Sequence, residues 1–353
     1  MEETTVQATP TAQTEKKQTR IIFDIAKFAL SILIVAIHTL FLPKILYPWL
    51  RIGVPLFFLI SAYFLFSKIN AAQTDEEKNA AVKKFCLRNL ILYLFWFVCL
   101  LPATIFIRPW FQGGVLQGIG LFLKSLFFGS TFVASWFIMA SVIATLLVFL
   151  ASKKLGNVAL LIISAVIYAL VCLRSSYFSL FDNAPFIQRC VQGYELIFGE
   201  PHLSFPAAFL WIVCGKCFAD KTFRLDKTFA WVLCILSAIL LYGEWWFVRY
   251  LNGSYSNDCY FFLAPLCIAV FTLLESAPDV PIKDSLFLRN SSVIIYALHG
   301  TVAIAVNSAV QNFLGEPFQF LSFFITLAVC LGAAWLLLRL EKIPALKWLK
   351  YAH

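Results

Sequence analysis

The sequence predicts an all-α, polytopic membrane protein with about ten transmembrane helices and both termini in the cytoplasm. Of its 353 residues, 61% are hydrophobic and only 13% are charged, and the mean hydropathy is +0.83. Apolar runs of roughly 20 residues, long enough to cross a bilayer as a helix, recur along the whole chain. Basic residues gather between alternate runs, which is the orientation signal of membrane proteins.

Ten apolar runs fit membrane spans, with boundaries soft by several positions. They lie at about 21–42, 48–68, 84–107, 133–152, 156–174, 203–220, 227–250, 258–275, 291–312 and 317–340. With the N-terminus inside, 20 of the 28 basic residues fall on the cytoplasmic side. Both termini inside requires an even number of spans, which ten satisfies. The net charge of +9 is therefore explained by basic residues that orient the protein beside anionic lipid, and it does not require a nucleic-acid partner.

The chain divides into three parts. Residues 1–20 are polar and are expected to form a disordered cytoplasmic tail. Residues 21–340 form a single transmembrane domain, whose first run lacks a cleavage site and is a retained helix. Residues 341–353 form a cytoplasmic C-terminal tail. The polar segment at 69–83 is interpreted as a solvated connector that continues a flanking helix.

Two long external connections, at about 108–132 and 175–202, are rich in aromatic residues. Long connections in a compact protein are usually functional or disordered. We expect these two to contain short re-entrant or interfacial helices that cover a cavity. Plain surface helices at the headgroups are an equally good interpretation.

The ten cysteines give little direction. Cys214 and Cys217 make a C-x-x-C pair near the inner end of a span, but there is no second pair, so no metal site is expected. Cys190 and Cys259 fall in predicted external segments. They could form a disulfide in an oxidising compartment, and the sequence leaves open whether they meet.

The first span carries a polar stripe. His38 and Lys27 are eleven residues apart, so at about 100° and 1.5 Å per residue they share a helix face and stand about 16 Å apart. Asp24 and Ser31 fall near the same stripe. Ionisable groups cost roughly 2.5–3.5 kcal/mol near the centre of a membrane helix, so they suggest a functional site. The stripe is expected to face protein or a water-filled cavity.

Each of these residues also has an ordinary interpretation. An imidazole such as that of His38 suits a general base near neutral pH, but a histidine in a membrane helix can also be a hydrogen-bonded packing residue. Lys27 could extend to the headgroups beside Asp24. Alternatively, Lys27 is a cation for a phosphate-bearing ligand that enters from the cytoplasm.

The second span adds Arg51 near its outer end, Pro55 and Ser61. Proline in a membrane helix frees a carbonyl that a ligand, water or neighbouring group must satisfy. Arg51 is placed either to anchor at the interface or to meet His38, since both lie toward the outer face.

The ninth and seventh spans contain further candidates. His299 lies about halfway through the ninth span, three residues after Tyr296, at a depth that does not suit a purely interfacial role. Glu244 and Arg249 in the seventh span are five residues apart and off a common helix face. Each is therefore expected to have its partner on another helix.

Four segments, read in order, resemble the membrane-bound acyltransferase-3 family of bacterial polytopic acyltransferases. DIAKFALSILIVAIHT resembles its first signature, with Lys27 where Arg is commoner. RIGVPLFFLISAYFLF resembles the second, with Ala62 in place of the usual Gly. SWFIMASVIATLL resembles a third block, with Ser135 where Leu is commoner, and SSVIIYALHGT resembles the last. The resemblance covers about residues 20–340.

The resemblance implies O-acyl transfer, usually of acetyl, from cytoplasmic acyl-CoA to a hydroxyl of a cell-envelope or surface carbohydrate at the bacterial inner membrane. Acyl-CoA is a co-substrate, and no bound cofactor, metal or nucleic acid is expected. The catalytic residues carried over are Lys27, His38, Ser61 and His299. Residues expected to bind substrate or donor are Asp24, Arg51, Tyr296, Glu244, Arg249 and Trp136.

The spacing in the first span suggests a route for the donor. The thioester would pass Lys27 and reach His38, which acts as a general base on the acceptor or carries the acyl group transiently. Arg51 or Ser61 could orient a substrate or stabilise the oxyanion. Two other classes stay open: a transporter or flippase of an envelope precursor, and a membrane sensor without catalysis. The acceptor, the acyl length and the oligomeric state are not given by the sequence.

Overall fold

The computed structural model describes residues 21–251, 258–278, 280, 282 and 285–353, and within them it contains helices and no strand. The predicted tail at 1–20 lies outside the described residues. The α-helices are α1 (Ile21–His38), α2 (Tyr47–Leu50), α3 (Gly53–Asn70), α4 (Asp75–Ile107), α5 (Val115–Phe128), α6 (Trp136–Ser152), α7 (Asn157–Ser175), α8 (Pro185–Phe198), α9 (Phe205–Ala219), α10 (Lys227–Tyr250), α11 (Leu263–Glu275), α12 (Ser285–Leu314) and α13 (Gln319–Leu340). The 3-10 helices are η1 (Lys44–Leu46), η2 (Phe178–Phe181), η3 (Pro201–Leu203) and η4 (Pro344–Ala352).

Each of the ten predicted runs contains an α-helix, which confirms the all-α fold class. Within the described residues, seven stretches are long and apolar enough to cross a membrane alone. The segment that includes α8 joins α9 at a bend of 46° and makes an eighth candidate, whereas α6 and α11 are shorter. The protein is therefore a multi-pass membrane protein. Ten crossings and cytoplasmic termini remain predictions.

Local sequence explains where the helices begin. The Thr74 side chain caps α4 by accepting a hydrogen bond from the Glu77 amide, and three acidic residues occupy the first turn, where the helix dipole favours them. α4 therefore begins at Asp75, inside the polar connector, as predicted. Asp226 caps α10 in the same way, accepting from the amides of Thr228 and Phe229.

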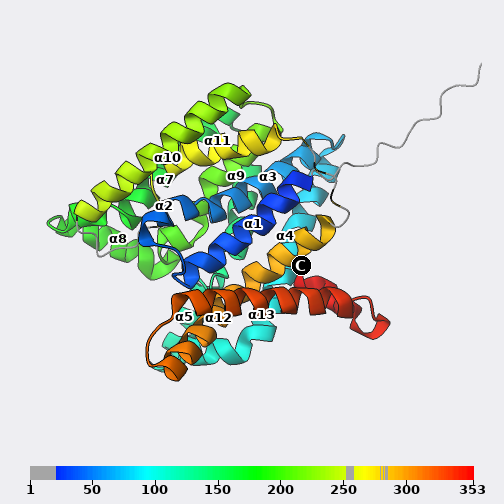
Figure 1. Ribbon diagram of the computed structural model, residues 1–353. Helices are drawn as coiled ribbons and strands as arrows, with labels where there is room; N and C mark the ends of the chain where they lie inside the picture. Colours follow the sequence, from blue (N-terminus) through cyan, green and yellow to red (C-terminus); the bar gives the residue numbers. More distant parts are fainter. Residues whose placement is uncertain (1–20, 252–257, 279, 281, 283–284) are drawn as a thin grey trace, which may run out of the picture.

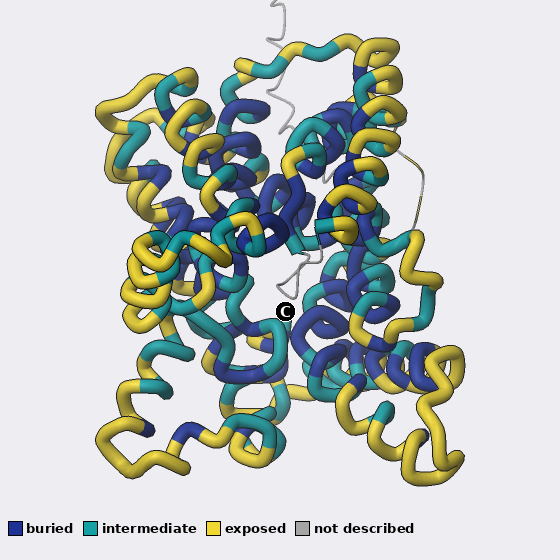
Figure 2. Tube along the Cα trace, turned by 90° about the vertical axis from the view of Figure 1, so that its left-hand side faces the viewer, coloured by how far each residue is buried: buried dark blue, intermediate teal, exposed yellow. Residues whose placement is uncertain are grey.

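A belt of exposed apolar side chains surrounds the bundle. The buried segments gather in its interior and the exposed ones outside it (Figure 2). The exposed side chains include Leu94, Val98, Ile105 and Phe106 on α4, Val158, Ile162, Val166 and Leu170 on α7, Trp231, Ile235 and Ile239 on α10, and Phe320, Phe324, Val329 and Leu336 on α13. A surface this apolar is suited to lipid and not to water.

α9 is the central helix of the larger core. Twelve of its 15 residues are buried, and it packs against α3, α6 and α7. α10 and α11 lie together at one side of the molecule, and α12 and α13 lie together at the opposite side (Figure 1). α1 packs along α12, so the beginning of the described chain contacts a helix near its end.

The helix ends gather at two poles of the bundle. At the first, which we call the Lys27 pole, the polar residue Asn157 at the start of α7 contacts Asp220 at the end of α9. At the second, the His38 pole, Arg51 forms an ion pair with Asp258 ahead of α11. The helices thus run between two opposite ends, as membrane-crossing helices do.

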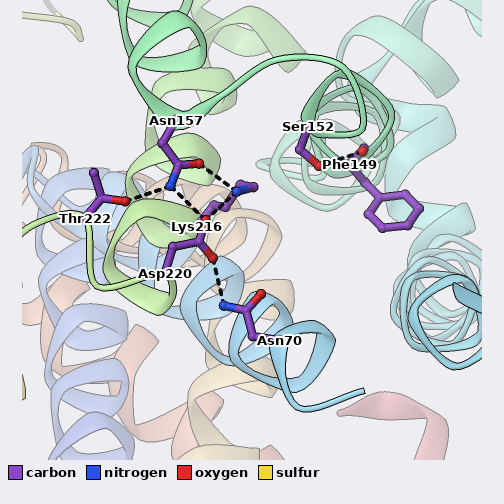
Figure 3. A network of polar contacts seen from close by, with 7 residues as sticks. All are labelled: Asn70, Phe149, Ser152, Asn157, Lys216, Asp220 and Thr222. Atoms are coloured by element: carbon purple, nitrogen blue, oxygen red, sulfur yellow. Dashed lines mark hydrogen bonds and ion pairs between the residues drawn. The ribbon is translucent and has the colours of Figure 1, made fainter. Parts of the chain in front are cut away.

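A polar network ties three helices together at the Lys27 pole (Figure 3). Asp220 accepts hydrogen bonds from the amides of Asn70 on α3 (2.7 Å) and Asn157 on α7 (2.8 Å), and it pairs with Lys216 on α9. Asn157 also donates to Thr222 over 2.7 Å. Nearby, Ser152 caps the end of α6 by donating to the carbonyl of Phe149 over 2.8 Å.

We expect this network to make the protein less stable in acid. Asp220 lies just beyond the end of α9. Burial raises its pKa, but hydrogen bonds from Lys216, Asn70 and Asn157 outweigh this, so the pKa is below its usual range. A lowered folded-state pKa gives stability that is complete above the unfolded-state pKa of about 4 and is lost as the pH falls through the folded-state value. The thermal midpoint of wild type should therefore fall below about pH 4 by more than that of Asp220→Asn. Parallel pH profiles of the two proteins would contradict this.

The C-terminal segment predicted as a tail packs against the bundle. Leu349 and Ala352 in η4 are buried, and the Trp96 indole donates a hydrogen bond of 3.0 Å to the Ala352 carbonyl. His353 contacts the Glu341 carboxylate over 2.8 Å. These contacts hold residues 344–353 against α4 and α13.

The ten cysteines are all free thiols. Cys214 and Cys217 are buried thiols in α9, and no group of ligands that could hold a metal ion occurs in the part of the chain that the structure describes. Cys190 is exposed and Cys259 is buried, and both are free thiols. The structure therefore does not form the disulfide that the sequence left open.

Candidate functional site

A cavity of about 320 Å³ opens at the His38 pole. α1, α3, α6, α9 and α12 contribute to its wall, together with both long external connections. Its aromatic residues include Trp136, Tyr168, Trp211 and Tyr296. Its ionisable residues are His38, Arg51, Arg108, His202 and Asp258. A mixed wall of rings and charges, in a cavity of at least 300 Å³, is typical of a site for a small polar molecule or one unit of a larger one.

His38 is the last residue of α1 and is exposed to this cavity. The helix stops there because Leu40 takes a left-handed backbone conformation with φ of 54°. Ending the helix at this point leaves the imidazole at the cavity wall. The His38 ring lies 4.8 Å from the His299 ring, centroid to centroid. The structure thus brings together two histidines that are 261 positions apart in the sequence.

His299 is fully buried behind His38. Its Nδ1 lies 2.6 Å from the Tyr296 carbonyl, and because a carbonyl only accepts, Nδ1 carries the hydrogen. Nε2 is then an acceptor, and it has no partner within the described residues. The Tyr296 hydroxyl donates to the Ala134 carbonyl over 2.9 Å, so α12 is fixed to the segment ahead of α6.

Charged residues at the other wall form a cluster. Arg51 makes an ion pair with Asp258, and His202 Nε2 lies 3.7 Å from the Asp258 carboxylate and 3.4 Å from that of Glu200. The charges of Arg51 and Asp258 are close enough to act on His38. Sequence reasoning placed Arg51 near His38 but missed Asp258 and His202. His202 ends a long connection and Asp258 begins a predicted span, and only the fold brings them together.

The Lys27 pole carries its own cluster of charges. Asp24 is buried, and Lys27 and Arg289 are near enough to act on it electrostatically. Arg88 on α4 is near Lys27 and Arg289. Lys27 is half-buried among these groups, so the stripe on α1 faces protein, as expected.

The cavity does not reach Lys27. Its only wall residues from α1 are Ile34, Ile37 and His38, in the last turn and a half of the helix. Ser31 is buried between the two poles and donates to the Phe28 carbonyl over 2.7 Å. The continuous route from Lys27 to His38 is thus not part of this cavity and stays a prediction.

Other predicted site residues lie elsewhere. α3 contributes Val54, Pro55 and Phe58 to the cavity, but not Ser61. Arg249 is exposed on α10 and lies over the ring of Trp245, a residue of the same helix, at 4.8 Å. Trp136 and Tyr296, in contrast, both line the cavity.

Glu244 has a structural role outside the cavity. Its carboxylate accepts hydrogen bonds from the amides of Phe261 (2.6 Å) and Phe262 (2.9 Å), just ahead of α11, and from the Tyr177 hydroxyl (2.7 Å). Carboxylates stabilise helix N-termini in this way. Glu244 thus has its expected partners outside its own helix, and these are two backbone amides and a tyrosine hydroxyl.

We expect Glu244→Ala to destabilise the protein by about 1–3 kcal/mol, because it leaves buried donors unsatisfied. Specific activity per folded molecule should stay within about twofold, since Glu244 does not line the cavity. Thermal unfolding in detergent and activity normalised to folded protein measure the two effects. A large loss of activity at unchanged stability would instead place Glu244 in the site.

The fold and the site define a multi-pass membrane protein with a histidine pair at one cavity. A family model described as an acyltransferase domain, that of the acyltransferase-3 family, matches residues 20–339. The chain belongs to this family, which confirms the resemblance seen in the sequence.

Two curated relatives carry a different name. The chain is 24% identical over 336 residues to an amino-acid racemase of Enterococcus faecalis, a match that covers 90% of this chain and 46% of the relative. It is 22% identical over 266 residues to a second amino-acid racemase of the same organism, covering 71% of this chain and 35% of the relative. The chain thus spans less than half the length of these relatives. No solved structure matches it.

Proposed function

We propose that this protein transfers an acyl group, usually acetyl, from acyl-CoA to a hydroxyl of a cell-envelope or surface carbohydrate. The observation that supports this most is the placement of His38 at a cavity wall with His299 directly behind it. The family supplies the reaction class. We further propose that the protein lies in the bacterial inner membrane with its Lys27 pole facing the cytoplasm.

His38 is the general base in this reaction. It takes the proton from the acceptor hydroxyl, whose oxygen attacks the thioester carbonyl and forms a tetrahedral intermediate. Collapse of that intermediate breaks the carbon–sulfur bond, and the leaving thiolate takes the proton back from His38. The products are an ester and free CoA. Arg51, at the same cavity, is the cation that we propose stabilises the oxyanion.

His299 positions His38. Its Nδ1 is bound to the Tyr296 carbonyl, so only Nε2 is left to bind a group outside its own helix. Nε2 can accept a hydrogen bond from the N–H of His38, whose ring lies beside it. That bond would leave the other nitrogen of His38 as the basic one for the acceptor.

The donor enters at the Lys27 pole. Lys27, Arg88 and Arg289 come from three helices: Lys27 and Arg289 act on the Asp24 carboxylate, and Arg88 lies near those two cations. Phosphate groups of CoA would compensate the excess positive charge. The pantetheine arm would then extend about 16 Å along α1 to His38. Opening of this route on donor binding is part of the proposal.

Release of free CoA by purified protein tests the proposal. Acetyl-CoA and a panel of acceptors, including sugars and free amino acids because of the racemase relatives, would be assayed for thiol release that depends on the acceptor. Mass spectrometry of envelope glycans with and without the protein should show loss of an acetyl-sized increment. Transport of an acceptor without thiol release would favour a transporter instead.

A further inference from the structure

Arg108 lies at the cavity of the histidine pair and has no acidic partner within the described residues. Its side chain lines the same cavity as His38, and its Nε is buried without a hydrogen-bond partner within the described residues. The ion pairs of the described residues leave it out, whereas Arg51 at the same cavity is paired with Asp258. A buried guanidinium donor without a partner is costly unless a ligand binds it.

The backbone holds Arg108 in place. It ends α4 because Pro109 follows and disfavours helical conformation in the preceding residue. The Arg108 amide donates to the Thr104 carbonyl (2.9 Å), and its carbonyl accepts from the Trp110 amide (2.9 Å). Trp110 is buried and its indole donates to Ser125 on α5 over 3.2 Å. The cation is therefore presented by a fixed turn and not by a loose loop.

The charged groups at the cavity wall leave Arg108 unpaired within the described residues, whereas Arg51 is paired. Arg51 and Arg108 contribute two positive charges to the wall, and Asp258 contributes one negative charge. His202 already faces Asp258 and Glu200 with Nε2, and its buried Nδ1 has no partner within the described residues. His202 Nδ1 is then an acceptor, and the unused donor that the wall offers is the guanidinium of Arg108.

We propose that Arg108 binds an anionic oxygen group, a carboxylate or a phosphate, on the acceptor. Guanidinium groups bind these groups in a two-point geometry that fixes orientation. Held there, an acidic sugar or sugar phosphate would present a hydroxyl to His38 across a cavity of about 320 Å³. This inference rests on the proposed acyl transfer and adds the charge class of the acceptor.

The kinetic test compares matched acceptors with acetyl-CoA as donor. Wild type should prefer glucuronate and glucose 1-phosphate to glucose. Arg108→Gln should raise KM for the anionic acceptors by about 10- to 100-fold, with little change for glucose, and Arg108→Lys should recover part of the loss. Arg189→Gln, an exposed arginine on α8, is the matched control. Equal losses for glucose and the anionic acceptors, or no preference in wild type, would overturn the inference.

Two further arms separate the alternatives. If Arg108→Gln impairs transfer from succinyl-CoA but not from acetyl-CoA, Arg108 binds the acyl group of the donor and the inference is wrong. If no acceptor gives thiol release, the proposed reaction has failed, and thermal shifts then test the anion site alone. Glucuronate should stabilise wild type and Arg189→Gln but not Arg108→Gln, and equal shifts in all three would contradict the site.

Discussion

Replacing His38 with alanine is expected to lower kcat for acyl transfer by about 100- to 10,000-fold, the range that general-base catalysis contributes. Within the described residues, His38 is the only histidine that is exposed at the cavity and has a second histidine ring, that of the buried His299, beside it. Without it the acceptor hydroxyl keeps its proton and is a poor nucleophile. KM for acyl-CoA should change much less, because the donor's phosphates are proposed to bind at the other pole.

The control for this variant is His353→Ala, which removes an imidazole bound to Glu341 near the end of the chain. It should keep full activity. Both variants should be present in the membrane at wild-type levels, as measured by quantitative blotting. A His38→Ala protein that is folded, abundant and fully active would contradict the proposed role. Rapid-quench kinetics on wild type would distinguish a general base from an acyl carrier, which gives a covalent acyl-histidine.

The largest effect on stability is expected from Gly215, where α9 meets α3. A Cβ at this position would lie 2.6 Å from the Ala62 Cβ, 2.6 Å from the Leu59 carbonyl oxygen and 2.9 Å from the Tyr63 amide. Two of these atoms are backbone and cannot rotate away. Gly215→Ala should therefore destabilise the protein by about 1–3 kcal/mol, and Gly215→Val by more. The thermal midpoint of detergent-purified protein measures the change.

Gly243 on α10 provides the matched control, because a Cβ there meets no atom within 4 Å. Gly243→Ala should be neutral or slightly stabilising, since alanine favours helix by about 1 kcal/mol over glycine. Adding Ala62→Gly to Gly215→Ala should restore only part of the loss, because the two backbone contacts remain. Full stability in Gly215→Ala alone would show that α3 and α9 are not packed as described.

This contact also answers a question that the sequence left open. Ala62 stands where the family usually has glycine, which put the close helix approach in doubt. The structure keeps the close approach by placing the glycine on the opposite helix, at position 215. A motif comparison along one segment could not show this, because the compensating residue is 153 positions away.

The fold was largely predictable, because apolar length is a strong signal in membrane proteins. The predicted spans coincide with helices, and the helices α5 and α8 occur in the two long connections, as expected. Buried faces were less predictable. The central position of α9 follows from packing on three sides, whereas its sequence differs little from that of the lipid-facing helices.

The candidate site was predictable where a residue is unusual for its surroundings. Ionisable groups within apolar runs, such as His38 and His299, stand out because burying them is costly. Arg108, His202 and Asp258 lie at the ends of connections and spans, where charged and polar residues are ordinary. Glu244 stood out for the same reason as His38, yet it caps a helix. Residue type and depth alone do not separate an ionisable side chain that lines a site from one that caps a helix.

The pairing of α1 with α12 has a consequence for biosynthesis. His38 leaves the ribosome early and His299 late, so the two rings can meet only after most of the chain has entered the membrane. Insertion proceeds from the N-terminus, so the polar stripe of α1 lacks part of its final protein cover until α12 has been inserted. An incomplete nascent chain therefore lacks the assembled histidine pair, and truncated products should be inactive in the proposed reaction.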